Sequence, residues 1–208
     1  MKTLSIAAGL MLFSGMTFAQ QETYKIDDAH SFANWTIRHV AAKASGTFSD
    51  IKGTLVIDRE NLANSSVDAR INMLSVDSSH AKRDDHIKKE DYLDAYKFGE
   101  ATFVSTNVKS TGADEGVITG KFTLHGVTRE ISLPFKVLGF DTDPWGGYRT
   151  GIEAKTSLKA SDYGYAWMNK PKASVGDDVE ITLLLEGVRV DPNAKPAGKS
   201  PDKSTDKK

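Results

Sequence analysis

The residues best suited to acid–base or metal chemistry in this sequence are five histidines and one charged cluster, Arg83-Asp84-Asp85-His86. General acid–base catalysis and metal binding both need such groups to converge in space. Along the chain they are scattered, and no HExxH, GxSxG, P-loop or CxxC motif occurs. The sequence therefore favours a protein that is not an enzyme, and we expect no cofactor and no bound metal.

Two histidines have a structural and a functional interpretation each. His39 alternates in phase with Trp35 and Ile37, so we expect it to face an interior, either as a hydrogen-bonded core residue or as a polar contact to a ligand. His30 follows Asp28 and precedes Ser31, and Asp and Ser are ordinary turn residues. Stabilisation of a turn is the favoured role for His30.

The charged cluster lies in the one segment, residues 78–91, that breaks the strand-like pattern and that we predict to be a short surface helix beginning at an Asp77/Ser78 cap. Helical spacing pairs Asp84 with Lys88, which explains much of the charge pattern locally. Alternatively, Arg83 and His86 lie at a cavity mouth and meet a polar head group, because a guanidinium offers a fork of donors to an oxygen.

Elsewhere apolar residues recur with period two, which is typical of half-buried β-strands. Short turn signals separate these runs, among them His125-Gly126, Pro144-Trp145-Gly146-Gly147 and Gly176-Asp177-Asp178. About eight closely spaced strands without alternating helices indicate an all-β, antiparallel barrel or sandwich with a short helix near one end. Whether such a barrel is hollow or packed solid with aromatic side chains is left open by the periodicity.

The two ends of the chain differ in composition from the middle. Residues 1–19 combine Lys2, an apolar run and a Thr17-Phe18-Ala19 end, which predicts a signal peptide cleaved after Ala19 and a periplasmic protein. Residues 20–190 form one predicted domain, and residues 191–208, rich in Lys and Pro, a predicted disordered tail. No later run is long enough to span a membrane, and a net charge of −1 does not favour a nucleic-acid partner.

The order and spacing of a series of short motifs is similar to that of the YceI-like family of exported polyisoprenoid-binding proteins with a lipocalin-like barrel. The similarity covers roughly residues 22–188. The motifs that carry it are Tyr24-Lys25-Ile26-Asp27 with His30-Ser31, Trp35-Thr36-Ile37-Arg38-His39, Phe48-Ser49-Asp50-Ile51-Lys52-Gly53-Thr54, Ser75-Val76-Asp77, Arg83-Asp84-Asp85-His86-Ile87-Lys88, Asp91-Tyr92-Leu93-Asp94, Gly120-Lys121-Phe122-Thr123-Leu124-His125-Gly126-Val127-Thr128 with Pro134, Ser161-Asp162-Tyr163-Gly164 and Val175-Gly176-Asp177-Asp178-Val179.

This resemblance implies a long isoprenoid or similar lipid threaded through the barrel, for transport, storage or sensing. It places one set of residues on the apolar walls: Trp35, Ile37, Phe103, Phe122, Phe135 and Trp167. It places a second set near the polar head group: His39, Arg83, Asp84 and His86.

Two alternative functions stay open. The chain could be a stress-response or respiratory accessory protein that acts through protein contacts of its helix or tail, or it could hold a metal with its histidines. A homodimer is also possible. A partner protein captured in a pull-down would favour the first alternative. A stoichiometric amount of metal in the purified protein would favour the second.

Overall fold

The fold is known from a computed structural model that describes residues 21–191. The predicted signal peptide, residues 1–19, lies outside the described residues, as does the predicted tail beyond residue 191. The strands are β1 (Gln21–Ile26), β2 (Phe32–His39), β3 (Ala42–Phe48), β4 (Ile51–Asp58), β5 (Ser66–Asn72), β6 (Val76–Asp77), β7 (Glu100–Ser110), β8 (Glu115–Leu124), β9 (Val127–Thr142), β10 (Tyr148–Lys159) and β11 (Val175–Arg189). The helices are α1 (Ala81–Ile87) and the short 3-10 helices η1 (Asp28–His30), η2 (Leu62–Asn64), η3 (Met73–Ser75), η4 (Ala160–Tyr163) and η5 (Trp167–Asn169).

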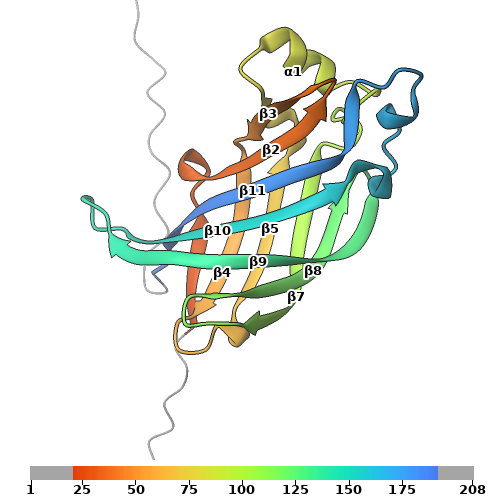
Figure 1. The fold of residues 1–208 in the computed structure, drawn as a ribbon. Coiled ribbons are helices and arrows are strands. Elements are labelled where there is room, and N and C mark those ends of the chain that lie inside the picture. Colours follow the sequence, from red (N-terminus) through yellow and green to blue (C-terminus); the bar gives the residue numbers. More distant parts are fainter. Residues whose placement is uncertain (1–20, 192–208) are drawn as a thin grey trace, which may run out of the picture.

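The strands close into an antiparallel barrel (Figure 1). Its ring runs β1-β4-β5-β7-β8-β9-β10-β11, and β11 pairs with β1 to complete it. Strands β2, β3 and β6 continue the sheet at the end where α1 lies (Figure 1). The predicted all-β barrel of about eight strands with one short helix near an end is therefore confirmed.

Three strands of the ring are broken in two at about the same level. The strand beside β11 consists of β1 and β2, which are separated by η1 and both pair with β11. The next strand consists of β3, which pairs with β2, and β4, which pairs with β1. The third consists of β5, which pairs with β4, and β6, which pairs with β3, with η3 between them. The breaks are capped, because Asp27 accepts a hydrogen bond from Ala29 N and Asn72 accepts one from Leu74 N. Asn72 Nδ2 also donates to Asp50 at 2.9 Å, so two breaks are fastened together.

Two sequence predictions are wrong in detail. The helix α1 begins at Ala81 with His80 as its cap, because Asp84 accepts hydrogen bonds from the backbone and the hydroxyl of Ser78 and holds that residue outside the helix. Residues 176–178 are not a turn but the start of β11, where the register against β2 shifts between Val175 and Val179. These residues form the irregular part of the strand at that register shift. Asp177 accepts hydrogen bonds from the backbone N–H and the hydroxyl of Ser161.

Clusters of buried side chains pack toward the two ends of the barrel. One end is filled by residues that include Tyr24, Leu55 and Leu62. At the end that carries α1, Tyr163, Tyr165 and Trp167 pack with Tyr92 and Leu93. None of the helices among residues 21–191 is long and apolar enough to cross a membrane.

Arg149 joins four parts of the barrel. Its guanidinium donates to Asp27 Oδ2 and to Asp143 Oδ2, each at 2.6 Å, and to Glu186. All of these side chains are at least two-thirds shielded from solvent. This network ties the break after β1 to β10, β11 and the β9–β10 turn.

The Arg149 network predicts a loss of stability in acid. The hydrogen bond from Arg149, then that from His30, lowers the pKa of Asp27; Arg149 and the Gly147 N–H lower the pKa of Asp143. Groups with depressed folded pKa values contribute stability above their unfolded pKa and lose it as pH falls through the folded value. We expect the free energy of unfolding to fall below about pH 4. Urea denaturation at pH 7, 5 and 3 measures it, and an equal midpoint at pH 5 and 3 would contradict the prediction.

Candidate functional site: the barrel cavity

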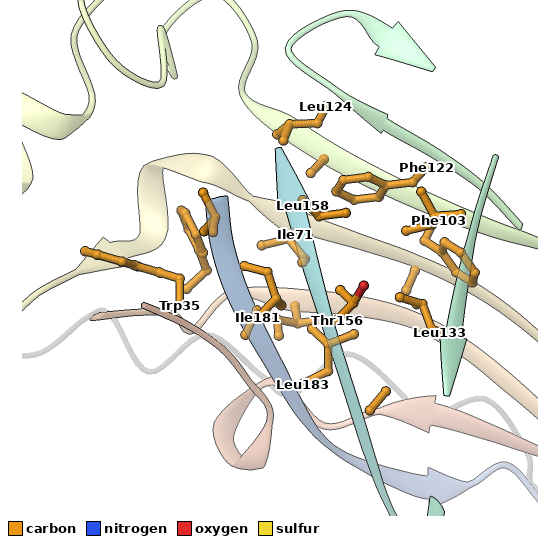
Figure 2. Close-up of a pocket in the computed structure, with 18 of the residues that line it drawn as sticks. Trp35, Ile71, Phe103, Phe122, Leu124, Leu133, Thr156, Leu158, Ile181 and Leu183 are labelled. Atoms are coloured by element: carbon orange, nitrogen blue, oxygen red, sulfur yellow. The ribbon is translucent and has the colours of Figure 1, made fainter. Parts of the chain in front are cut away.

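The interior of the barrel is hollow. A cavity of about 480 Å³ runs through it, within the range of roughly 300–1,000 Å³ typical of small-molecule sites. Figure 2 shows apolar side chains from several strands, among them Phe103, Leu133 and Ile181, around this space. The question that periodicity left open is thereby answered, because aromatic side chains line the barrel without filling it.

The period-two pattern explains why the wall is apolar. On β10 and β11 the alternating residues Ile152, Ala154, Thr156, Leu158, Val179, Ile181, Leu183 and Leu185 all line the cavity. The residues between them are charged or polar in most cases, and Lys155 and Glu180 are exposed. Alternate side chains of a strand point to opposite faces of the sheet. The alternating sequence therefore places apolar side chains on the inner face of the barrel and polar ones on its outer face.

All six residues predicted as apolar wall line the cavity: Trp35, Ile37, Phe103, Phe122, Phe135 and Trp167. Two of them are held by specific contacts. Trp167 Nε1 donates to the Gly176 carbonyl at 2.8 Å, and the ring of Phe122 meets that of Tyr163 edge-on at 5.5 Å. The wall is therefore formed by side chains whose positions are fixed by packing.

Trp35 owes its place to a glycine on the neighbouring strand. A Cβ at Gly46 would lie 2.4 Å from Trp35 Cζ2 and 2.5 Å from the Asp77 carbonyl oxygen. We expect Gly46→Ala to lower the free energy of unfolding by about 1–3 kcal/mol, because the indole and the backbone must move apart. Thermal melting measures it, and the exposed Ser45→Ala is the control on the same strand. Equal melting of both variants would show that this contact is not needed.

Three of the four predicted polar residues line the cavity at the α1 end. His39, Arg83 and His86 are exposed and also line the cavity, which places them at its mouth. Arg83 is partly engaged, because its Nε donates to Ser78 Oγ at 2.7 Å and its Nη2 to the Ser78 carbonyl at 2.5 Å. Less of its donor fork is available for a ligand than the sequence suggested.

Asp84 differs from the other three. It is buried, does not belong to the cavity lining, and accepts from Ser78. Burial raises its pKa, but the hydrogen bonds from Ser78 outweigh that effect and the net pKa is lowered. Its role in the structure is to hold Ser78, and through it Arg83, at the mouth.

One cluster in the described part of the chain has metal-ligand types close together, namely Asp27, His30 and Glu186. Arg149 already donates to both carboxylates, so a cation occupies the position that a metal would take. His30 Nδ1 lies 2.9 Å from Asp27 Oδ2 at η1, which confirms the turn role predicted for it.

Sequence reasoning missed part of the wall. Ile71, Met73, Ala101, Leu124 and Tyr165 also line the cavity. Of these residues, Leu124 belongs to one of the motifs of the family resemblance, and Ile71 lies on a regular strand, β5. No signal in the sequence tells that Tyr165, in the irregular segment after β10, turns inward.

A closed antiparallel barrel with an apolar cavity and polar side chains at one mouth defines the class of β-barrel ligand-binding folds. Residues 24–187 match the model of the YceI-like domain. The chain belongs to the YceI-like family.

Relatives and solved structures agree with this assignment. The chain is 40% identical over 185 residues to Protein YceI of Escherichia coli O157:H7, covering 88% of this chain and 94% of that protein. It is 39% identical over 186 residues to a UPF0312 protein of Ectopseudomonas mendocina, covering 89% of this chain and 96% of the relative.

Two solved structures that share the fold illustrate the similarity. BcnA of Burkholderia cenocepacia has a TM-score of 0.68 at 21% identity, over 77% of this chain and 98% of that chain. A polyisoprenoid binding domain from Saccharophagus degradans, implicated in plant cell wall breakdown, has a TM-score of 0.61 at 18% identity, over 80% and 98%. At these identities the two structures bear on the fold alone.

Proposed function

We propose that this protein is a periplasmic binding protein that holds a long-chain polyisoprenoid or similar lipid in its barrel, for transport, storage or sensing. The observation that carries the proposal is the cavity of about 480 Å³ with its almost wholly apolar wall. The polyisoprenoid binding domain with the same fold supports the choice of lipid. Binding by burial of apolar surface needs no catalytic group, so the proposed function is not enzymatic.

Apolar burial favours long chains over short ones. Each buried methylene gains about 0.8 kcal/mol, while association costs on the order of 4–15 kcal/mol in lost freedom. About ten buried methylenes gain about 8 kcal/mol, which is close to the middle of that range of cost and leaves little net affinity. A chain must therefore fill the cavity to bind well, and the polar residues His39, Arg83 and His86 at the mouth suit the less apolar end of such a lipid.

Native mass spectrometry with lipid extraction tests the proposal. The protein is delipidated and incubated in turn with a long-chain polyprenol and with a short isoprenol. We expect one long-chain adduct per barrel and no stable short-chain adduct. A barrel that stays empty with the long-chain polyprenol would overturn the lipid proposal.

The periplasmic location has its own test. N-terminal sequencing of the exported protein should begin at Gln20, one residue after the predicted cleavage site. A mature chain that begins at Met1 would remove the basis for export.

A further inference from the structure

The cavity wall contains a tyrosine whose hydroxyl has no hydrogen-bond partner among residues 21–191. Tyr165 is 6% exposed and lines the cavity. Its hydroxyl forms no hydrogen bond with any other residue between 21 and 191, and the surroundings that shift its pKa likewise include no hydrogen-bond partner. Tyrosine hydroxyls of largely buried side chains usually have a hydrogen-bond partner. This one is not fully enclosed, so a molecule in the cavity can reach it.

The ring of Tyr165 is fixed by its neighbours. It stacks on Trp167 with ring centroids 4.6 Å apart and on His125 at 4.4 Å. His125 is itself held, since its Nδ1 lies 3.0 Å from the Tyr163 carbonyl oxygen. Because a tyrosine hydroxyl lies in the plane of its ring, this stacking also fixes where the hydroxyl lies.

The hydroxyl of Tyr165 is a neutral donor in an environment that disfavours anions. Burial, and to a lesser extent the charge of Asp94, raises the pKa of Tyr165, so the phenol keeps its proton at neutral pH. Arg83, the cation at the mouth, already donates to Ser78 through two of its nitrogens. An anionic group beside Tyr165 would lose its hydration near a carboxylate, whereas a neutral oxygen would not carry that cost.

A second donor without a partner, Trp35 Nε1, makes a useful contrast. It is fully enclosed, and its indole packs against Gly46. A ligand in the cavity therefore cannot reach it without moving the ring. The Tyr165 hydroxyl is not enclosed in this way. Ring contacts connect Tyr165 through Trp167 and Tyr92 to His86 at the mouth.

We propose that the Tyr165 hydroxyl donates a hydrogen bond to a neutral oxygen of the bound lipid, a hydroxyl, ether or carbonyl oxygen near the less apolar end of its chain. This inference rests on the proposed lipid-binding function and narrows its ligand class. The barrel then selects an oxygenated isoprenoid over a hydrocarbon of the same length. Tyr165 is the residue that determines this specificity, while the apolar walls supply affinity for both.

Matched ligands and a single-atom substitution test the inference. Dissociation constants are measured for a long-chain polyprenol and for the hydrocarbon in which hydrogen replaces its hydroxyl group, with the full chain and with Tyr165→Phe. We expect Tyr165→Phe to weaken binding of the polyprenol roughly tenfold, the worth of one hydrogen bond. Binding of the hydrocarbon should not change. Tyr96→Phe is the matched control, because Tyr96 is 75% exposed and lies outside the cavity lining.

The outcomes separate this inference from the function on which it rests. If Tyr165→Phe binds the polyprenol as tightly as the unchanged protein, the hydroxyl does not contact the ligand and the inference is overturned. An equal loss for both ligands would also overturn it, since that is the result of disturbed packing. If the unchanged protein binds neither ligand, the lipid-binding function itself fails.

Discussion

The substitution Thr156→Trp is expected to abolish lipid loading while the barrel stays folded. Thr156 lies on β10 and points into the cavity between Leu158 and Leu183 (Figure 2). An indole there occupies space that the lipid chain needs. Loss of only three buried methylenes costs about 2.4 kcal/mol, which is a roughly 50-fold loss of affinity. Titration with a long-chain polyprenol, followed by native mass spectrometry, measures the effect.

The neighbouring substitution Ser157→Trp is the control for Thr156→Trp. Ser157 is the next residue on the same strand, so its side chain is exposed on the outer face. The control should load lipid as the unchanged protein does. Thr156→Trp should also melt at or above the original temperature, because filling an apolar cavity commonly stabilises a fold. Full lipid loading of Thr156→Trp would mean that the ligand does not lie in this part of the barrel.

The second large effect is expected at Arg149, and it concerns stability rather than binding. Arg149→Met leaves Asp27, Asp143 and Glu186 without their shared cation. Removing one partner of a buried charge network costs about 3–5 kcal/mol, and the partial exposure of this one favours the lower end. About 3 kcal/mol corresponds to a melting temperature lower by about 6–12 °C for a chain of this size.

A surface pair provides the comparison for Arg149→Met. Lys43 and Glu180 are bound at 2.7 Å, but both side chains are about 60% exposed. Lys43→Met should change the free energy of unfolding by at most about 1 kcal/mol. Arg149→Met should also flatten the stability profile between pH 5 and 3, because Asp27 and Asp143 lose the hydrogen bond that lowers their pKa values. An unchanged melting temperature for Arg149→Met would show that the network does not hold the barrel together.

The walls of the site could be predicted because strand periodicity is a local property. Trp35 and Ile37, or Ile181 and Leu183, share a face in any regular strand, so spacing predicts which side chains point the same way. That the face with Trp35 and Ile37 is a ligand wall was implied by the family resemblance. The same argument could not reveal the cavity. Whether the side chains of opposite strands meet or leave a space depends on how the ring closes through β1 and β11, and that pairing joins residues far apart in the sequence.

Other features escaped prediction because they depend on particular contacts. Asp84 looked like a head-group ligand beside Arg83, but the pairing with Ser78 turns it away from the cavity. Residues 176–178 look like a turn because Gly and Asp are turn residues, yet β2 beside them allows a bulge instead. Tyr165 lies in an irregular segment, where no period indicates which way a side chain points.

A crystal structure of the protein loaded with a long-chain polyprenol tests the central claim most directly. We predict continuous tubular density inside the barrel, bounded by Trp35, Phe103 and Phe122, with its oxygenated end toward the α1 mouth. Side chains that fill the interior, or a polyprenol bound only on the outer surface, would contradict the claim that this barrel is a lipid container.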